Sequence, residues 1–165
     1  MPELQFQLSP MARADLAAID RLEASAFGPG RFARTAYRLR EGAQPDWDLS
    51  FVARVGPLMV GANRITGILC GGQRALLLGP LTVESAFHRR GIGAALVARS
   101  LEVARAGGHQ LVILVGDEPF YGRFGFFRVP PGRLVLPGPV DAARLLACEL
   151  AAAAFAGVEG AVGRG

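Results

Sequence analysis

The sequence predicts a single mixed α/β domain, and three observations support this. First, the chain has 165 residues, of which 51% are hydrophobic and only 19% are charged, so it can bury a full core and is not a disordered chain. Second, strand-like segments joined by glycine turns fill residues 49–83, as in antiparallel hairpins. Third, an amphipathic helix from residue 91 leads into a short apolar segment, which indicates one β-α-β unit. We therefore expect residues 1–165 to form one α/β (α+β) domain, with a mostly antiparallel sheet flanked by helices.

The first third of the chain predicts one strand and two helices. Residues 4–8 alternate apolar and polar side chains, which is typical of a half-buried strand. Ser9-Pro10 then predicts a helix start, with the serine as its cap and the proline at an early position. Apolar residues at near-helical spacing continue to Phe27, and Gly28-Pro29-Gly30 should end this helix. A second short helix is expected from Phe32 to about Arg40.

The middle of the chain predicts three strands, at Leu49–Val55, Leu58–Leu69 and Ala75–Val83. Gly56-Pro57 and Gly71-Gly72 are the turn signals between them. Gly61 and Gly67 are candidate bulges in the second strand. Because proline cannot donate a ladder hydrogen bond, Gly79-Pro80 should mark a bulge or a place where strand pairing opens.

A helix is expected at Gly91–Ala106, because its apolar residues fall on one face and Gly107-Gly108 follows. The apolar, β-branched stretch Leu111–Val115 predicts a buried strand that pairs in parallel with an earlier one. Prolines divide the last third, where Phe126–Val129 and Arg133–Leu136 are expected as strand fragments. Residues 144–155 have helical propensity, yet a strand at Leu145–Leu150 would fit a sheet edge, and we expect the strand.

The charge pattern points to an anion at one place. The net charge is +4 and the pI is about 10.0, and basic proteins often bind nucleic acid, anionic membranes or phosphorylated molecules. Most arginines are scattered as on a solvated surface, and only His88-Arg89-Arg90 forms a compact run. Aromatic residues do not interleave with the arginines as they do in single-strand binders, so we expect no nucleic-acid partner.

The cysteines and the apolar segments indicate neither a metal site nor a membrane protein. Cys70 and Cys148 lack metal-ligand spacing and are expected to be buried thiols, without a metal. The first ten residues show no signal peptide. The apolar stretch at 145–158 is shorter than the roughly 20 residues that a membrane-spanning helix needs. We expect a cytoplasmic protein with no membrane partner.

The strongest motif is the run from His88 to Ala94, which follows the strand end Leu81-Thr82-Val83 and opens a helix. The first turn of a helix presents unpaired N–H groups and a partial positive charge. Glycines at Gly91 and Gly93 let a ligand approach the backbone. Arginines are slightly destabilising at a helix N-terminus, and a bound anion reverses that sign. The run therefore predicts a phosphate site.

Two common phosphate motifs fit this run poorly. The nucleoside-triphosphate loop Gly-x-x-x-x-Gly-Lys-Ser/Thr is absent from the sequence. A dinucleotide fingerprint needs a third glycine, but Leu96 stands there. Asp117, after the next strand, could stand for the acid that binds a ribose, which keeps this interpretation open. Too little chain remains, however, for a doubly wound sheet.

Two blocks of sequence together resemble the GNAT superfamily of N-acetyltransferases. His88–Gly93 is similar to the pyrophosphate signature Gln/Arg-x-x-Gly-x-Gly/Ala, with histidine at its first position. Phe120–Phe126 is similar to the Tyr-x-x-x-Gly-Phe segment of the family. The resemblance is strongest over residues 76–126, and residues 115–126 resemble small bacterial members of predicted function. It implies the GNAT fold, with a splayed central pair of parallel strands.

The resemblance also implies a reaction and its residues. Acetyl-CoA would be the cosubstrate, and its acetyl group would pass directly to the primary amine of a small molecule or peptide. The backbone of Leu81, Thr82 and Val83 would bind the pantetheine arm, with the Leu81 N–H as oxyanion donor. Tyr121 would act as general acid, or else be only a packed aromatic. The residues implied in phosphate binding are His88, Arg89, Arg90, Gly91, Ile92, Gly93 and Ala94.

The sequence leaves the general base, the acceptor and the oligomeric state open. Glu84, Asp117 and Glu118 lie near the site in the chain, and Glu23 could reach it from the first helices. Each of these carboxylates also fits a solvated surface residue. Arg31 and Arg34 could favour an acidic acceptor, although exposed arginines are the ordinary interpretation. A homodimer stays open. A non-catalytic sensor module that binds acetyl-CoA or CoA is the alternative function.

Overall fold

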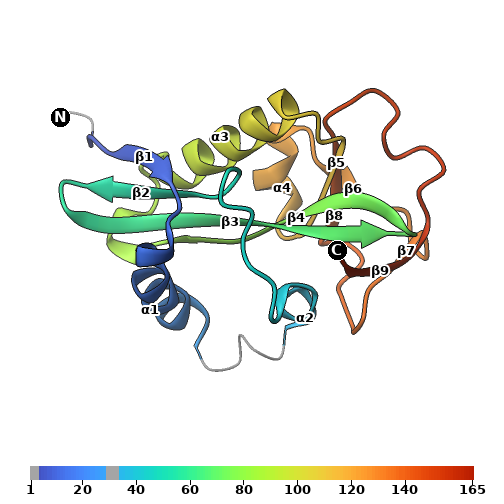
Figure 1. Ribbon diagram of the computed structural model, residues 1–165, viewed down its shortest axis with the longest axis horizontal. Coiled ribbons are helices and arrows are strands. Elements are labelled where there is room, and N and C mark those ends of the chain that lie inside the picture. The colour runs from blue at the N-terminus through green and yellow to red at the C-terminus, as the bar shows by residue number, and fades with distance from the viewer. Residues whose placement is uncertain (1–3, 29–33) are drawn as a thin grey trace.

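The computed structural model describes residues 4–28 and 34–165 (Figure 1). The α-helices are α1 (Leu16–Phe27), α2 (Thr35–Arg40), α3 (Ile92–Ala106) and α4 (Glu118–Tyr121). The strands in the first half of the chain are β1 (Gln7–Pro10), β2 (Phe51–Val55), β3 (Leu58–Cys70) and β4 (Gln73–Val83). Those in the second half are β5 (Leu111–Val115), β6 (Phe127–Arg128), β7 (Leu134–Val135), β8 (Leu145–Glu149) and β9 (Gly160–Arg164).

The sheet has the order β1-β2-β3-β4-β5-β8-β6, and β9 lies along the end of β3. The pairs along this order are antiparallel except β4–β5, which is parallel. Helix α3 connects these two parallel strands, as a β-α-β unit requires. The predicted fold class, a mostly antiparallel mixed sheet with one parallel pair, is therefore confirmed.

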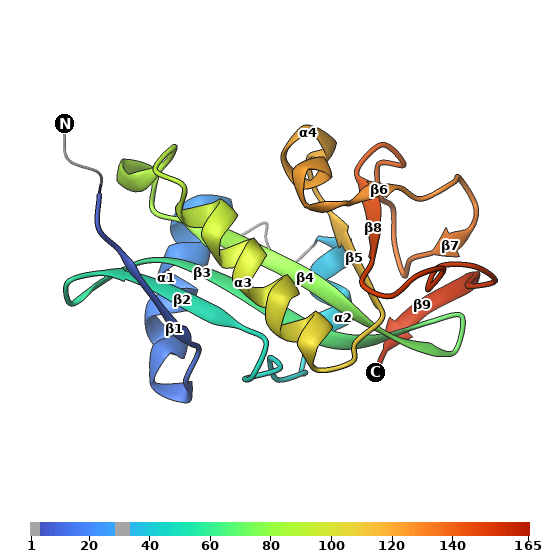
Figure 2. The ribbon, with the colours of Figure 1, turned by 90° about the horizontal axis from the view of Figure 1, so that it is seen from above.

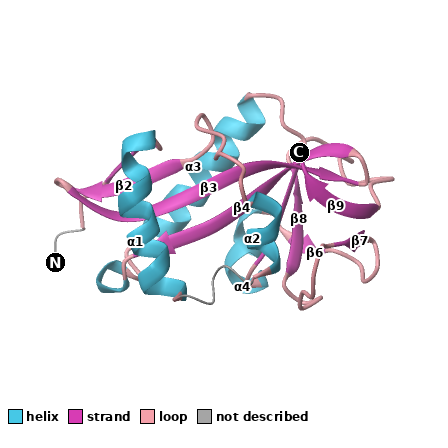
Figure 3. Cartoon of the chain, turned by 60° about the horizontal axis from the view of Figure 1, so that its bottom comes forward, coloured by secondary structure: helices cyan, strands magenta, loops and turns pink. Residues whose placement is uncertain are grey.

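The helices cover both faces of the sheet. Helix α3 lies across β2, β3 and β4 on one face, while α1 and α2 lie on the other (Figures 1 and 2). Turning the molecule brings α1 and α2 in front of the strands, with α3 behind them (Figure 3). Helix α3 approaches β3 closely at Gly61, where a Cβ would lie 3.2 Å from the side chains of Ile92 and Leu96. This glycine therefore sets the height of α3 above the sheet.

The sheet opens at Gly79-Pro80, as the sequence predicts. The register between β3 and β4 shifts there, since Leu78 pairs with Ile65 while Leu81 pairs with Asn63. Pairing of β4 with β5 is confined to two positions, Leu76–Val112 and Leu77–Ile113. Beyond them β4 continues to Val83 while β5 diverges from it. The central parallel pair is thus splayed at its carboxyl end.

The predicted start of the first helix is wrong. Ser9 and Pro10 belong to β1, where Ser9 pairs with Val52 and its hydroxyl accepts a hydrogen bond from Arg54. A 3₁₀ turn at Arg13–Asp15 comes before α1, and the carboxylate of Asp15 accepts the N–H of Ala12. Asp15 thus satisfies the backbone that Ser9 was expected to cap. The strand predicted at residues 4–8 correspondingly begins three residues later and ends two residues later, at Gln7–Pro10.

Other boundaries differ by a few residues. Helix α2 begins at Thr35, and residues 32 and 33 of the predicted helix lie outside the described residues, as do Pro29 and Gly30. The bulge in β3 falls at Val60, beside Gly61, while Gly67 pairs regularly with Leu76 and forms no bulge. The strands expected at 126–129 and 133–136 shorten to β6 and β7.

The stretch after residue 144 is a strand, as expected, and not a helix. In β8, Leu145 and Ala147 face one buried cluster, while Leu146 and Cys148 face another. Alternate side chains can be buried on both sides only when the backbone is extended between two apolar layers. Strand β9, which follows a series of turns, was not predicted from the sequence.

Candidate active site

The start of α3 presents free backbone N–H groups. The first bond of the helical ladder runs from the N–H of Ala95 to the carbonyl of Gly91, at 3.0 Å. The N–H groups of Ile92, Gly93 and Ala94 precede this bond and point out of the helix end. Gly91 has φ 82° and Arg89 has φ 62°, so the chain turns sharply into the helix with left-handed residues on both sides of Arg90. This is the geometry of an anion-binding turn.

A cleft, which we call the α3 cleft, lies at this helix start. A Cβ on Gly93 would lie 3.7 Å from the side chains of Leu81 and Val83 and 3.8 Å from the ring of Phe120. These are ordinary contact distances, so protein packing alone does not require glycine here. The α3 cleft is lined by Leu81, Val83, Phe87, His88, Arg89, Gly91, Ile92, Gly93, Ala94, Phe120 and Arg123.

Strand β4 offers an open edge to this cleft. Glu84 donates its N–H to the carbonyl of Val60, at 2.7 Å, so its backbone faces β3. Successive residues of a strand direct their backbone groups to opposite edges, so Val83 and Leu81 face the β5 side. Because the pairing of β4 with β5 ends at Leu77, the N–H of Leu81 lies on an edge with no strand paired to it among the described residues.

His88, Arg89 and Arg90 lie around the cleft in different ways. The imidazole Nε2 of His88 donates to the carbonyl of Val83, at 2.8 Å, and so ties the loop to the end of β4. Arg89 and Arg90 are exposed, and within the part of the chain that the structure describes neither forms an ion pair. Their charges are therefore available to a ligand at the helix start.

Tyr121 ends the short helix α4 beside the splayed strands. Its ring packs edge-on against Phe120, with centroids 4.8 Å apart, and against Phe126, at 5.8 Å. It also lies over Gly116, where a Cβ would come within 2.5 Å of the ring. Burial raises the pKa of the Tyr121 phenol to about 12, the Asp117 carboxylate adds to the rise, and Arg144 opposes it. The phenol is therefore protonated at neutral pH.

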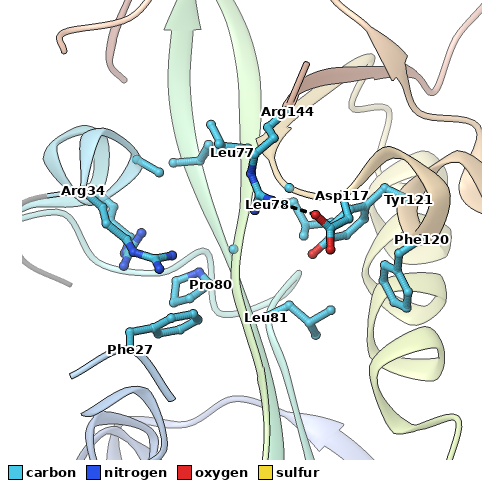
Figure 4. Close-up of a pocket in the computed structure, with 15 residues that line it drawn as sticks. Phe27, Arg34, Leu77, Leu78, Pro80, Leu81, Asp117, Phe120, Tyr121 and Arg144 are labelled. Carbon is cyan, nitrogen blue, oxygen red and sulfur yellow. Dashed lines mark hydrogen bonds and ion pairs between the residues drawn. The ribbon is translucent and has the colours of Figure 1, made fainter. Parts of the chain in front are cut away.

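A second cavity, the Tyr121 cavity, lies between the splayed strands and α2 (Figure 4). Asp117 and Arg144 form an ion pair of 2.6 Å on the same side as Tyr121, and Arg34 and Phe27 lie on the opposite side. Residues from the carboxyl-terminal parts of β4 and β5 complete the lining. The residues that line the Tyr121 cavity are Phe27, Arg34, Ala36, Arg40, Leu77, Leu78, Gly79, Pro80, Leu81, Val115, Gly116, Asp117, Phe120, Tyr121 and Arg144. Leu81 and Phe120 line both cavities, so the Tyr121 cavity adjoins the α3 cleft.

A family model for the acetyltransferase (GNAT) family matches residues 16–126. The chain belongs to the GNAT family. The solved structure of the GNAT N-acetyltransferase YhbS from Escherichia coli, in complex with CoA, has a TM-score of 0.83 and 24% identity. The match covers 99% of this chain and 91% of that one. No curated protein matches the sequence.

Two further GNAT structures share the fold at lower scores. An acetyltransferase from Brucella melitensis, in complex with acetyl-CoA, has a TM-score of 0.63 and 24% identity, covering 93% of this chain and 99% of that one. The ribosomal-protein-S18-alanine N-acetyltransferase from Escherichia coli has a TM-score of 0.63 and 18% identity, with 89% and 95% covered. These likenesses bear on the fold.

Most of the residues that sequence reasoning placed in this GNAT site lie together. Leu81, Val83 and six of the seven residues from His88 to Ala94 line the α3 cleft, and Tyr121 lines the adjoining cavity. Arg90 lines neither cavity. Thr82 is buried with its backbone paired to Ala62, and its side chain alternates to the opposite face from Leu81 and Val83.

The four candidate bases lie in different places in the structure. Asp117 lines the Tyr121 cavity, whereas Glu84 lines a hollow near α1. Glu118 pairs with Arg128 at the surface, and Glu23 is buried beside Arg64. Among the described residues no group of three or more His, Cys, Asp or Glu side chains could hold a metal ion, and no helix there is long and apolar enough to cross a membrane.

Sequence reasoning missed three residues of the site. Gly116 follows the last residue of β5, and a glycine at the end of a buried parallel strand was the available signal. Arg144 lies in the turn just before β8, and its ion pair with Asp117 spans 27 residues, which no local pattern reveals. Arg40 ends α2 and is buried, although arginines are rarely buried.

Proposed function

We propose that the protein is an acetyl-CoA-dependent N-acetyltransferase that moves the acetyl group directly to a primary amine. The observation that carries the proposal is the continuity of the α3 cleft and the Tyr121 cavity through Leu81 and Phe120. An anion site, an open strand edge and a buried phenol thus follow one another along a single path. GNAT structures that contain CoA and acetyl-CoA share this fold.

The residues present fit acetyl-CoA. The N–H groups of Ile92, Gly93 and Ala94 would donate hydrogen bonds to phosphate oxygens. Arg89 would add positive charge at the opening of the α3 cleft. The backbone of Leu81 on the open edge would bind the pantetheine arm, as a neighbouring strand would. Acetyl-CoA supplies a thioester that an amine can attack. In this protein, the N–H of Leu81 would stabilise the negative charge that develops on the thioester carbonyl oxygen.

Tyr121 is the group that we propose to serve the leaving thiolate. Its hydroxyl lines the cavity and stays protonated, because its pKa is raised to about 12. Complete proton transfer to a thiolate with a conjugate-acid pKa of ~8.5 is therefore uphill by roughly 3 to 4 pKa units. Tyr121 would stabilise the thiolate mainly by donating a hydrogen bond, with proton transfer completed as the product leaves.

Asp117 is the carboxylate that we propose to receive the proton of the amine. It is the acidic side chain that lines the Tyr121 cavity within the described residues, and Arg144 holds one of its oxygens at 2.6 Å. This ion pair fixes the direction of the carboxylate and leaves its second oxygen for an amine or a water molecule. Substitution of Asp117 by Asn should lower kcat most at the lowest pH values, where the amine is mainly protonated.

A transfer assay separates this proposal from the alternative, a non-catalytic sensor of acetyl-CoA. Free CoA is followed with a thiol reagent across amino acids, polyamines, aminoglycosides and peptides. Burial raises the pKa of Cys70 to about 11 and raises that of Cys148, so the protein's own thiols should contribute little signal. Turnover with any amine, lost with Asp117→Asn, supports an enzyme. Tight binding of acetyl-CoA without turnover supports the sensor.

Three further expectations stay predictions. Residues 1–165 are expected to form a single domain, the protein is expected in the cytoplasm, and a homodimer is one of the oligomeric states left open. Size-exclusion chromatography with light scattering, with and without acetyl-CoA, measures the oligomeric state directly.

A further inference from the structure

Two guanidinium groups line one wall of the Tyr121 cavity, which we call the α2 wall: those of Arg34, the residue before α2, and Arg40, the last residue of α2. Arg40 is 8% exposed, yet it lines this cavity, and its Nε is buried with no hydrogen-bond partner among the described residues. Its guanidinium lies 5.0 Å from the ring centroid of Tyr37. Arg34 is exposed and lies 4.6 Å from the ring centroid of Phe27. An aromatic face thus holds each guanidinium group, and the Nε–H of Arg40 remains without an acceptor among the described residues.

The acidic side chains nearby do not neutralise these two arginines. The charge of Glu23 raises the pKa of Arg40 and so partly offsets the effect of burial. Glu23 forms its ion pair, of 3.6 Å, with Arg64, and the charge of Arg64 lowers the pKa of Arg40. Asp117, across the cavity, pairs with Arg144. Neither Arg34 nor Arg40 forms an ion pair within the described ranges 4–28 and 34–165. The α2 wall is therefore positively charged.

The energetics indicate that this charge serves a ligand. Burial lowers the pKa of Arg40 to about 10, so holding its charge inside the protein costs free energy. A buried charge without a paired carboxylate is rare in proteins, because its lost hydration is not replaced. An anion in the cavity would replace that hydration and use the free donors.

We propose that the acetyl acceptor is a small amine that also carries an anionic group, bound by Arg40 and Arg34. This inference rests on the proposed function and names its substrate class. The amine would lie beside Asp117 and Tyr121, and the anionic group would lie across the cavity at α2 (Figure 4). The anion is a carboxylate or a phosphonate-like group, since both match the planar donor set of arginine.

The same wall selects against cationic acceptors. A diamine or polyamine that placed its first amine at Asp117 would direct its second ammonium towards Arg34 and Arg40. Like charges that approach closely and are partly shielded from water disfavour binding strongly. A further hollow between α2 and residues 139–144 adjoins the Tyr121 cavity, since Arg34 and Arg144 line both, so a substrate longer than an amino acid has room on this path.

The test compares four amines in which two methylene groups separate the amine from the group at the far end, which is a carboxylate, a phosphonate, a methyl group or an aminomethyl group. They are β-alanine, 2-aminoethylphosphonate, propylamine and 1,3-diaminopropane, each also used as a homologue two carbons longer. We expect kcat/KM to be at least about tenfold higher for an anionic member than for propylamine, and lowest for the diamine. The carboxylate and phosphonate members decide between the two anions.

Variants locate the anion on the α2 wall. Arg40→Gln and Arg34→Gln should each lower the ratio of kcat/KM for the anionic amine to kcat/KM for propylamine by about tenfold. Arg38→Gln is the matched control, because Arg38 is on the same helix but is exposed and bonds the carbonyl of Pro137. Acetyl-CoA binding, measured by calorimetry, verifies that each variant is folded.

A second measurement decides the inference even without turnover. Calorimetry in the presence of CoA should show N-acetyl-β-alanine binding more tightly than N-propylacetamide, with the difference lost in Arg40→Gln. Equal binding, or a preference for the neutral or cationic compounds, would overturn the inference while the transfer activity stands. Absence of turnover with every amine, together with a preference for the acetylated anion, would instead overturn the proposed enzyme and leave the anion site.

Discussion

The ring of Tyr121 lies directly over Gly116, the residue that follows the last position of β5. A Cβ at position 116 would lie 2.5 Å from Cε2 of Tyr121 and 3.1 Å from Cδ1 of Leu114. Gly116 does not have a left-handed backbone, so it supplies space and not conformational freedom. The carboxyl end of β5 thus sets how deep the phenol lies in the cavity.

Gly116→Ala should displace Tyr121 and impair the reaction. The ring cannot remain in place beside the new methyl group, so we expect a loss of about 1–3 kcal/mol in the free energy of unfolding. kcat should fall about as far as in Tyr121→Phe, and the double variant should be no slower than Tyr121→Phe alone. Urea denaturation and steady-state kinetics measure the two effects.

Gly122→Ala is the control for this substitution. Position 122 has a helical backbone, and a methyl group added there would meet open space, with no atom of another part of the chain within 4 Å. The stability and kcat of this variant should stay close to those of the original protein. Full activity in a folded Gly116→Ala variant would show that the position of the phenol does not matter to catalysis.

The sequence analysis identified those site residues that a local sequence pattern indicates. The glycines and arginines at the start of α3 follow from spacing alone, and so does the opening of the sheet at Gly79-Pro80. Gly116 escaped because its constraint comes from Tyr121, a residue that packs on it through tertiary structure. The pairing of Arg144 with Asp117 escaped for the same reason.

Tyr121→Phe tests the hydrogen bond of the phenol without changing the ring. The packing against Phe120 and Phe126 should persist. Acetyl-CoA affinity should persist too, because the phosphate site that we propose lies at the start of α3 and does not include Tyr121. A hydrogen bond to a charged group contributes about 1.5–3 kcal/mol, so we expect kcat to drop by at least about tenfold. Tyr121→Ala should in addition lower the melting temperature. A normal kcat in a stable Tyr121→Phe variant would remove the phenol from the reaction.

The pKa of Tyr121 gives a prediction about alkaline pH. Its value in the folded protein, about 12, exceeds the ordinary value of 10.0, so ionisation is resisted by folding. Its contribution to stability is complete below pH 10 and is lost as the pH rises to about 12. The difference in tyrosinate absorbance between the original protein and Tyr121→Phe should therefore rise near pH 12, and kcat should show no decline from this phenol below about pH 11. Ionisation centred near pH 10 would contradict the buried environment.

Gly93 offers a direct test of the phosphate site. Gly93→Asp places a carboxylate at a helix N-terminus, which favours the helix but repels phosphate. We expect the protein to stay folded while acetyl-CoA affinity falls by at least about tenfold in calorimetric titrations. Gly93→Ala is the steric control, because its methyl group would make only ordinary contacts of 3.7–3.8 Å. Undiminished binding in Gly93→Asp would move the phosphates away from this helix.

The errors of the sequence analysis have a common physical cause. Ser9-Pro10 is a good local signal for a helix start, but pairing with β2 extends the chain there and leaves the cap to Asp15. Strand β9 has no strong strand pattern of its own, since it contains Gly160 and Gly163. It forms because the end of β3 beyond Asn63, where β2 no longer pairs, offers a free edge. Long-range pairing overrode local preference in both cases.

Arg40 leads to a prediction about the conflict between stability and function. In the protein without a bound anion, its buried guanidinium lacks an ion pair among the described residues, and burial lowers its pKa to about 10. Arg40→Met keeps an unbranched apolar stem and removes the charge, at the loss of about 0.5–1 kcal/mol of cation–π attraction to Tyr37. Because a buried charge without an ion-pair partner costs free energy, we expect the free energy of unfolding to stay the same or rise. Arg54→Met is the contrasting variant, since it breaks the ion pair of Arg54 with the buried Asp15 and should destabilise the protein.

Urea denaturation measures the free energy of unfolding of both variants. A loss of more than about 1 kcal/mol in Arg40→Met would mean that Arg40 stabilises the fold, and a structural role would then account for its burial.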